Sequence, residues 1–138
     1  MKLTPILIVF VVLLAGCSGG TSFSSTCNNV TDARTSVCDI DFATLTGAYS
    51  KDVEVNLVAN GQITIPLYLE MTVASGTVSV SYTNASGERV SQTGSQSAPL
   101  VIQDTAQIDG TVVKLTFTSS AAATGVSVDL AAGENAWR

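Results

Sequence analysis

Apolar and polar residues alternate with a period of two from residue 52 onward, and this pattern restricts the fold of the chain more than any other feature. A period of two is the spacing of side chains on one face of a half-buried β-strand. The longest run covers residues 63–73, where the inward row would be Ile63, Ile65, Leu67, Leu69, Met71 and Val73. Turn residues interrupt the alternation at short intervals, which is typical of all-β domains. The turns are expected at Asn60-Gly61, Ser75-Gly76, Asn84-Ala85-Ser86-Gly87 and Asp109-Gly110.

The pattern predicts about seven or eight short strands around one core, in a small antiparallel β-sandwich of the jelly-roll or immunoglobulin-like kind. We expect strands over residues 53–59, 63–73, 78–82, 100–102, 113–117 and 126–130, with a weak outer strand inside 88–98 and a loop over 119–125. Residues 39–50 suit an opening strand better than a short helical turn. Asn60-Gly61 is a strong hairpin signal because both residues tolerate positive φ. Pro66 cannot donate to a ladder and marks an edge, a bulge or a break.

The first sixteen residues have the layout of an export signal. Lys2 is followed by an apolar, uncharged stretch over residues 3–15, and small residues close it. A bilayer core needs about 20 apolar residues, and only about thirteen are present before the chain turns polar. We therefore expect residues 1–16 to be a signal peptide, in preference to a transmembrane anchor.

The end of this segment, Leu14-Ala15-Gly16-Cys17, resembles the lipobox of bacterial lipoproteins at all four positions. The resemblance implies that the signal is cut before Cys17 and that this cysteine carries diacylglycerol and further acyl chains. Two or more chains hold a protein to a membrane far more firmly than one. The alternative is an ordinary signal with a cysteine nearby.

Residues 17–26 are then expected to be the lipidated cysteine and a flexible, polar tether, with the sandwich domain over 27–138. The resemblance places the protein in the bacterial cell envelope, facing away from the cytoplasm. In a two-membrane cell, Ser18 after the cysteine would favour the outer membrane. The net charge of −5 becomes more negative once Lys2 is removed, which disfavours nucleic acid as a partner.

Cys27 and Cys38 remain as a pair once Cys17 is assigned to lipid, and an even remainder in an exported chain predicts a disulfide. A loop of this size is worth about 3 kcal/mol in the chain-entropy picture. The alternative, a metal or redox pair, has the wrong spacing for Cys-x-x-Cys and lacks a histidine partner.

The chain contains no histidine, which removes the commonest general base and every Ser-His or Cys-His nucleophile. No phosphate-binding glycine loop occurs outside the tether, and we expect no cofactor and no metal centre. The remaining catalytic route needs paired carboxylates. The acidic residues lie in turns or at outward strand positions, where solvated surface charge is the expected role. An enzyme acting through Glu70 and Asp104 is the weakest of the alternatives.

Three residues are candidates for contact with a ligand. Asp39 and Asp41 supply oxygen atoms of the kind that Ca²⁺ prefers, although their spacing is not that of an EF-hand loop. Tyr68 is predicted to point away from the inward row of its strand, where an aromatic ring can hold a sugar or a partner side chain. Ordinary surface is the alternative for each.

The sandwich region also resembles the pre-peptidase C-terminal and GOLD-like modules of secreted bacterial proteins. The similarity lies in Asn60-Gly61-Gln62-Ile63-Thr64-Ile65, in Val78 to Tyr82 with the turn that follows, and in Asp109-Gly110-Thr111 before Val113 to Phe117. Val112 departs from it, since that family usually has an aromatic there. The resemblance implies a non-catalytic module. We therefore expect a lipid-anchored interaction or structural protein with an envelope protein or glycan as partner, and, as the alternative, a glycan- or calcium-binding accessory domain.

Overall fold

The structure, a computed structural model, describes residues 20–30, 34–55 and 61–137, and every regular element in these ranges is a β-strand. All the strand pairs are antiparallel. The expected signal peptide and Cys17 lie outside the described residues. The strands are β1 (Ser22–Val30), β2 (Thr35–Glu54), β3 (Thr64–Ser75), β4 (Thr77–Thr83), β5 (Arg89–Ser95), β6 (Leu100–Gln107) and β7 (Val112–Gly133).

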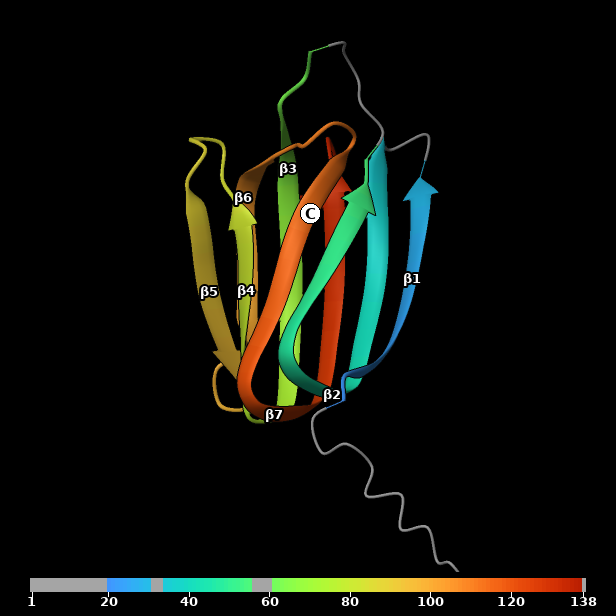
Figure 1. The fold of residues 1–138 in the computed structure, drawn as a ribbon. Coiled ribbons are helices and arrows are strands. Elements are labelled where there is room, and N and C mark those ends of the chain that lie inside the picture. The colour runs from blue at the N-terminus through green and yellow to red at the C-terminus, as the bar shows by residue number, and fades with distance from the viewer. Residues whose placement is uncertain (1–19, 31–33, 56–60, 138) are drawn as a thin grey trace, which may run out of the picture.

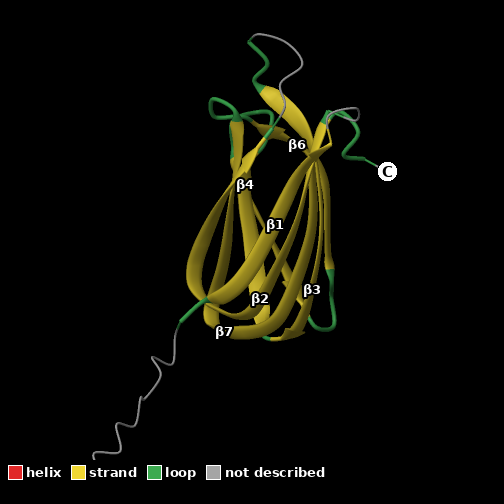
Figure 2. Cartoon of the chain, turned by 90° about the vertical axis from the view of Figure 1, so that its right-hand side faces the viewer, coloured by secondary structure: helices red, strands yellow, loops and turns green. Residues whose placement is uncertain are grey.

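Two of these strands, β2 and β7, are long and bend over at one end of the molecule, so that the sheet closes into two layers (Figures 1 and 2). The first half of β2 pairs with the second half of β7, and the second half of β2 pairs with the first half of β7. The bend in β2 falls where the register shifts between Leu45 and Gly47, and Gly47 has a φ of 75° there. Strands that change layers through bulges are a known way to turn the corner of a sandwich.

The expectation of a loop over residues 119–125 is wrong, because β7 continues through this stretch as a bent strand. Small residues fill the bend, and Gly125 adopts a φ of 56°. An alternation pattern breaks at such a bend just as it does at a loop, and this explains the error.

The order of the strands is that of a jelly roll. One layer runs β1, β2 (first half), β7 (second half), β3 and β6, and the other runs β2 (second half), β7 (first half), β4 and β5. Such double-sheet arrangements bring together strands that are far apart in the chain. The predicted antiparallel β-sandwich is therefore confirmed, with jelly-roll connectivity.

The inward rows of both layers form one apolar core, as the alternation predicts. Tyr82, Phe42 and Phe117 are the largest side chains in it. Most of the predicted row of β3 belongs to the core, including Ile65, Leu67, Leu69, Met71 and Val73. Ile63 does not, since it precedes β3 and is 64% exposed.

The hairpin expected at Asn60-Gly61 is wrong. Asn60 lies outside the described residues, but the strands on either side of the turn do not pair with each other. The second half of β2 pairs with β7 in one layer, whereas β3 pairs with β6 and β7 in the other. Of the edge, bulge or break expected at Pro66, the structure shows a local edge: Pro66 has a pairing partner only in β6, and β7 joins β3 from Leu67 onward, although β3 as a whole lies inside its layer.

The domain begins earlier than the sequence suggested. Ser22–Thr26, expected to be part of a flexible tether, form the first half of β1 and pair with β2. Serine and threonine suit an exposed edge strand, and Phe23 fixes the strand by contacting Tyr49, with 4.4 Å between the ring centroids. Cys27 and Cys38 are direct cross-strand partners and form the predicted disulfide.

Candidate functional site

Two of the three predicted ligand residues line one groove. Tyr68 of β3 and Asp39 of β2 contribute to a surface groove of about 400 Å³ on the outer face of the five-stranded layer. Glu70 and Asp129 complete its polar part, and its apolar part consists of Val37, Leu130, Ala131 and Ala136. We call this feature the acidic groove.

The strand register brings the three carboxylates of the groove side by side. Asp39 of β2 is the cross-strand partner of Asp129 of β7, and Asp129 is in turn the partner of Glu70 of β3. All three are exposed on the outer face. Directly opposed like charges destabilise a sheet, so this row is a local cost to the fold.

Asp129, the middle member, shows the electrostatic consequence. Partial burial raises the pKa of its carboxyl, and a hydrogen bond with Asp39 and the negative charges of Asp39, Glu70 and Asp41 raise it further. The charged form of Asp129 is therefore harder to maintain than that of an isolated aspartate.

Tyr68 is tied to the row through its hydroxyl, which donates a hydrogen bond to the Glu70 carboxylate. This bond, with some burial and the charges of Glu70 and Asp129, raises the pKa of the phenol. The hydroxyl therefore stays protonated at neutral pH, and Tyr68 presents a half-buried ring beside carboxylate acceptors.

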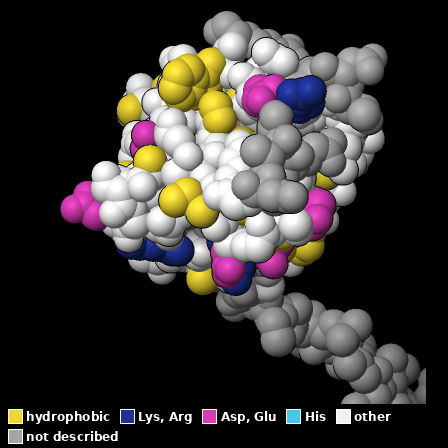
Figure 3. All heavy atoms as spheres, turned by 90° about the horizontal axis from the view of Figure 1, so that it is seen from above, with side chains coloured by type: hydrophobic (Ala, Val, Ile, Leu, Met, Phe, Trp, Pro, Cys, Tyr) yellow, Lys and Arg dark blue, Asp and Glu magenta, His cyan; other side chains and the backbone are white. Residues whose placement is uncertain are grey.

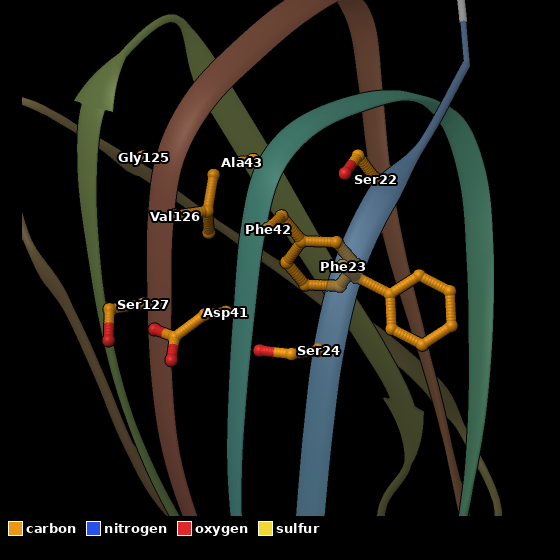
Figure 4. Close-up of a pocket in the computed structure, with 9 residues that line it drawn as sticks. All are labelled: Ser22, Phe23, Ser24, Asp41, Phe42, Ala43, Gly125, Val126 and Ser127. Atoms are coloured by element: carbon orange, nitrogen blue, oxygen red, sulfur yellow. The ribbon is translucent and has the colours of Figure 1, made fainter.

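Asp41 lies on the same face of β2 but not in the acidic groove. It lines a second, shallow hollow of about 510 Å³ with Ser24 and Ser127. Figure 4 shows their oxygen atoms to the left of the Phe23 ring and lower than the Phe42 ring. The predicted pair Asp39 and Asp41 is thus divided between two surface features. In the described part of the chain, no three His, Cys, Asp or Glu side chains are grouped to hold a metal ion.

The sequence reasoning missed Glu70 and Asp129 as neighbours of Tyr68. Both stand at outward-facing positions of the alternation, but alternation gives the face of a residue and not its cross-strand partner. Only the jelly-roll register places β2, β7 and β3 next to one another.

Asp104, one of the weak catalytic candidates, has a structural role. Its carboxylate accepts a hydrogen bond of 2.5 Å from the hydroxyl of the buried Tyr82. Its other oxygen accepts one of 2.7 Å from the backbone N–H of Thr105. Asp104 and Glu70 therefore do not form a catalytic pair: one bonds to the core tyrosine and the other lies on the outer face.

Within the described ranges, no helix has the length and apolar character needed to cross a membrane.

No protein-family model and no curated protein sequence matches the chain. Among solved structures it is similar to the coconut allergen cocosin, with 11% identity and a TM-score of 0.42 over 86% of this chain and 27% of that one. It is also similar to an oxalate oxidase in complex with the substrate analogue glycolate, with 15% identity and a TM-score of 0.41 over 89% of this chain and 55% of that one. A carbohydrate-binding module of Cellvibrio mixtus lichenase 5A, in complex with cellotriose, has 14% identity and a TM-score of 0.35 over 82% of this chain and 87% of that one. The chain thus spans about a quarter of cocosin and about half of the oxidase.

Proposed function

We propose that this protein is a lipid-anchored, non-enzymatic module of the bacterial cell envelope, and that its jelly-roll domain serves in interaction or in envelope structure. The observation that carries the proposal is the lipobox Leu14-Ala15-Gly16-Cys17 at the end of an apolar export signal. The position of the domain supports it, since Thr21, four positions after Cys17, already bonds to the domain through Thr46.

The chemistry of the surface supports the non-enzymatic part of the proposal. A pair of catalytic carboxylates flanks the bond that reacts, so that the acid and the base reach the bound substrate from two sides. The carboxylates of the acidic groove instead lie in one row on an open face, and the chain has no histidine to act beside them. The space between the layers is filled by apolar side chains.

Intact mass spectrometry of the membrane fraction tests the anchor. The wild type should begin at Cys17, carry a diacylglyceryl group, and gain the mass of two hydrogens when Cys27 and Cys38 are reduced. Cys17→Ser should leave the membrane fraction, because the acyl chains supply the membrane affinity. The matched control is Ser18→Ala, which should stay lipidated. An uncut or unlipidated wild type would overturn the proposal.

A second candidate function is the binding of a glycan in the acidic groove. Sugar hydroxyls are donors that carboxylates accept, and a half-buried tyrosine ring offers a flat apolar surface. Tyr68 lies beside Glu70 and Asp129 in this arrangement.

Titration of the purified protein with neutral and amino-sugar oligosaccharides, followed by thermal shift, tests this candidate. A binding sugar should raise the midpoint of unfolding, and Tyr68→Ala should abolish that rise. Thr72→Ala is the control, because Thr72 lies on the same face of β3 but outside the groove. Midpoints that stay unchanged across the panel would remove the candidate.

A further inference from the structure

Among the residues that the structure describes, those at one end of the sandwich include no charged side chain. We call this end the tether pole, and it consists of the bends of β2 and β7, the turn between β3 and β4, the turn between β5 and β6, and the entry of the chain at residues 20–22 (Figure 1). The bends and turns of the pole lie within the stretches 42–50, 71–83, 90–103 and 115–128, and none of these contains Asp, Glu, Lys or Arg. Alanine, serine, threonine and glycine make up most of its exposed residues.

The opposite end of the molecule has a different character. It carries ion pairs between Arg34 and Glu134, at 3.4 Å, and between Lys114 and Asp109, at 2.9 Å. Seen from above, this distal pole shows acidic and basic side chains around its rim (Figure 3). The uncharged character is therefore confined to the end where the chain enters.

The start of the described chain is attached to the tether pole. The Thr21 hydroxyl donates a hydrogen bond of 3.2 Å to the Thr46 carbonyl oxygen, and the Thr46 N–H donates one of 3.4 Å to the Thr21 hydroxyl oxygen. Thr46 lies in the bend of β2. From Thr21 back to Cys17 there are four residue steps, which span at most about 14 Å when fully extended.

We infer that the tether pole rests against the headgroup layer of the bilayer to which Cys17 is anchored. The inference rests on the proposed function, because it needs the lipid on Cys17. A link of at most about 14 Å keeps Thr21 within that distance of the anchored cysteine, so the end of the domain that holds Thr21 lies nearest to the membrane.

The distribution of charge fits this orientation. An acidic protein is repelled by anionic headgroups over about one Debye length, which is about 8 Å at physiological ionic strength. The acids nearest to the pole, Asp41 and Asp104, lie four positions along their strands from Leu45 and Leu100. At about 3.3 Å per residue this separation is about 13 Å, beyond the range of strong repulsion. The acidic groove would then face sideways and the distal pole outward.

Depth-dependent fluorescence quenching tests the inference on the lipidated, full-length protein in vesicles of phosphatidylcholine and phosphatidylglycerol. Trp137 is the native reporter at the far end, where its indole N–H donates to the Leu67 carbonyl oxygen. Figure 2 shows the C-terminus opposite the chain entry. The pole reporter is Ala121→Trp in a Trp137→Phe background, since Ala121 is exposed in the bend of β7.

With spin-labelled headgroups, the Ala121→Trp reporter should be quenched several-fold more than Trp137. Addition of Ser97→Asp, at the pole, should weaken this quenching, whereas the matched change Ser86→Asp in the distal turn should not. Circular dichroism checks that each variant is folded. Equal quenching of the two reporters, or none, in protein with the diacylglyceryl mass would overturn the orientation alone. A mass without lipid would overturn the proposed function and the orientation with it.

Discussion

At the scale of single residues, the contact between Tyr82 and Asp104 is a part-buried polar interaction between the two layers. Tyr82 belongs to β4 and is fully buried, and Asp104 belongs to the edge strand β6 of the other layer. Burial is the main cause that raises the pKa of Tyr82 to about 12, and the Asp104 hydrogen bond adds to it. The phenol therefore remains a donor throughout the physiological range.

We predict that Tyr82→Phe lowers the free energy of unfolding by about 1 to 3 kcal/mol, since the Asp104 carboxylate loses its partner. The pH dependence gives a sharper test. Because the pKa in the folded state is above the ordinary value of 10.0, the stabilisation by Tyr82 is full below pH 10 and is lost as pH rises toward about 12. Urea titrations at pH 8 and pH 11 should show a smaller difference between wild type and variant at pH 11. A constant difference would contradict this account.

The row of carboxylates in the acidic groove leads to a dependence on pH of the same sign, but in the acidic range. The pKa of Asp129 is raised in the folded state, so the folded protein takes up this proton first and gains stability as pH falls toward 4. Asp129→Asn should remove that gain. At pH 7 it should also raise the free energy of unfolding by up to about 1 kcal/mol, by relieving the repulsion from Asp39 and Glu70. Glu88→Gln, in the distal turn, is the control. If Asp129→Asn leaves the free energy of unfolding unchanged at both pH values, the charges of the row are fully screened by solvent.

At the scale of elements, the bends and meeting points of β2 and β7 depend on glycines. Gly133, at the end of β7, has a φ of 152°, and a Cβ there would lie 2.3 Å from the Arg34 carbonyl oxygen and 2.5 Å from the Thr35 Cα. Gly47, in the bend of β2, has a φ of 75° but open space around it. The two positions separate the effect of backbone conformation from that of close approach.

We predict that Gly47→Ala destabilises the protein by about 1 to 2 kcal/mol, the cost of a left-handed conformation. Gly133→Ala should cost a further 1 to 3 kcal/mol or so, because the backbone of β2 must move to make room for the methyl group. Chemical denaturation of both variants measures the difference. If the two variants lose the same amount of stability, the ends of β2 and β7 can move apart at no cost in free energy.

The sequence predicts which face of a strand each side chain lies on much better than it predicts which strands pair with one another. Alternation identifies the inward row of β3 and the outward position of Tyr68, because the period of a strand is a local property. It does not reveal that Asp39, Asp129 and Glu70 adjoin, which depends on pairing between strands up to 90 residues apart. It also fails where a strand bends at residues 119–125, and at Ser22–Thr26, where a polar edge strand has the composition of a tether.

At the scale of the whole molecule, the passage of β2 and β7 through both layers makes the layers parts of one strand pair. Neither layer can lose its central strands without removing them from the other. The disulfide between Cys27 and Cys38 joins β1 to β2 and so ties the outermost strand to the same pair. Each layer is therefore stable only in the presence of the other.

We predict that the domain, with its disulfide intact, unfolds in a single cooperative transition. Trp137 packs against β3 and reports on the five-stranded layer, whereas far-ultraviolet circular dichroism reports on both layers. The two signals should give the same midpoint, and the calorimetric and van't Hoff enthalpies should agree. Gly47→Ala should lower the midpoint of both signals together, although Gly47 is remote from Trp137. Loss of the circular dichroism signal before the tryptophan signal would show that the four-stranded layer unfolds separately, which the shared strands should prevent.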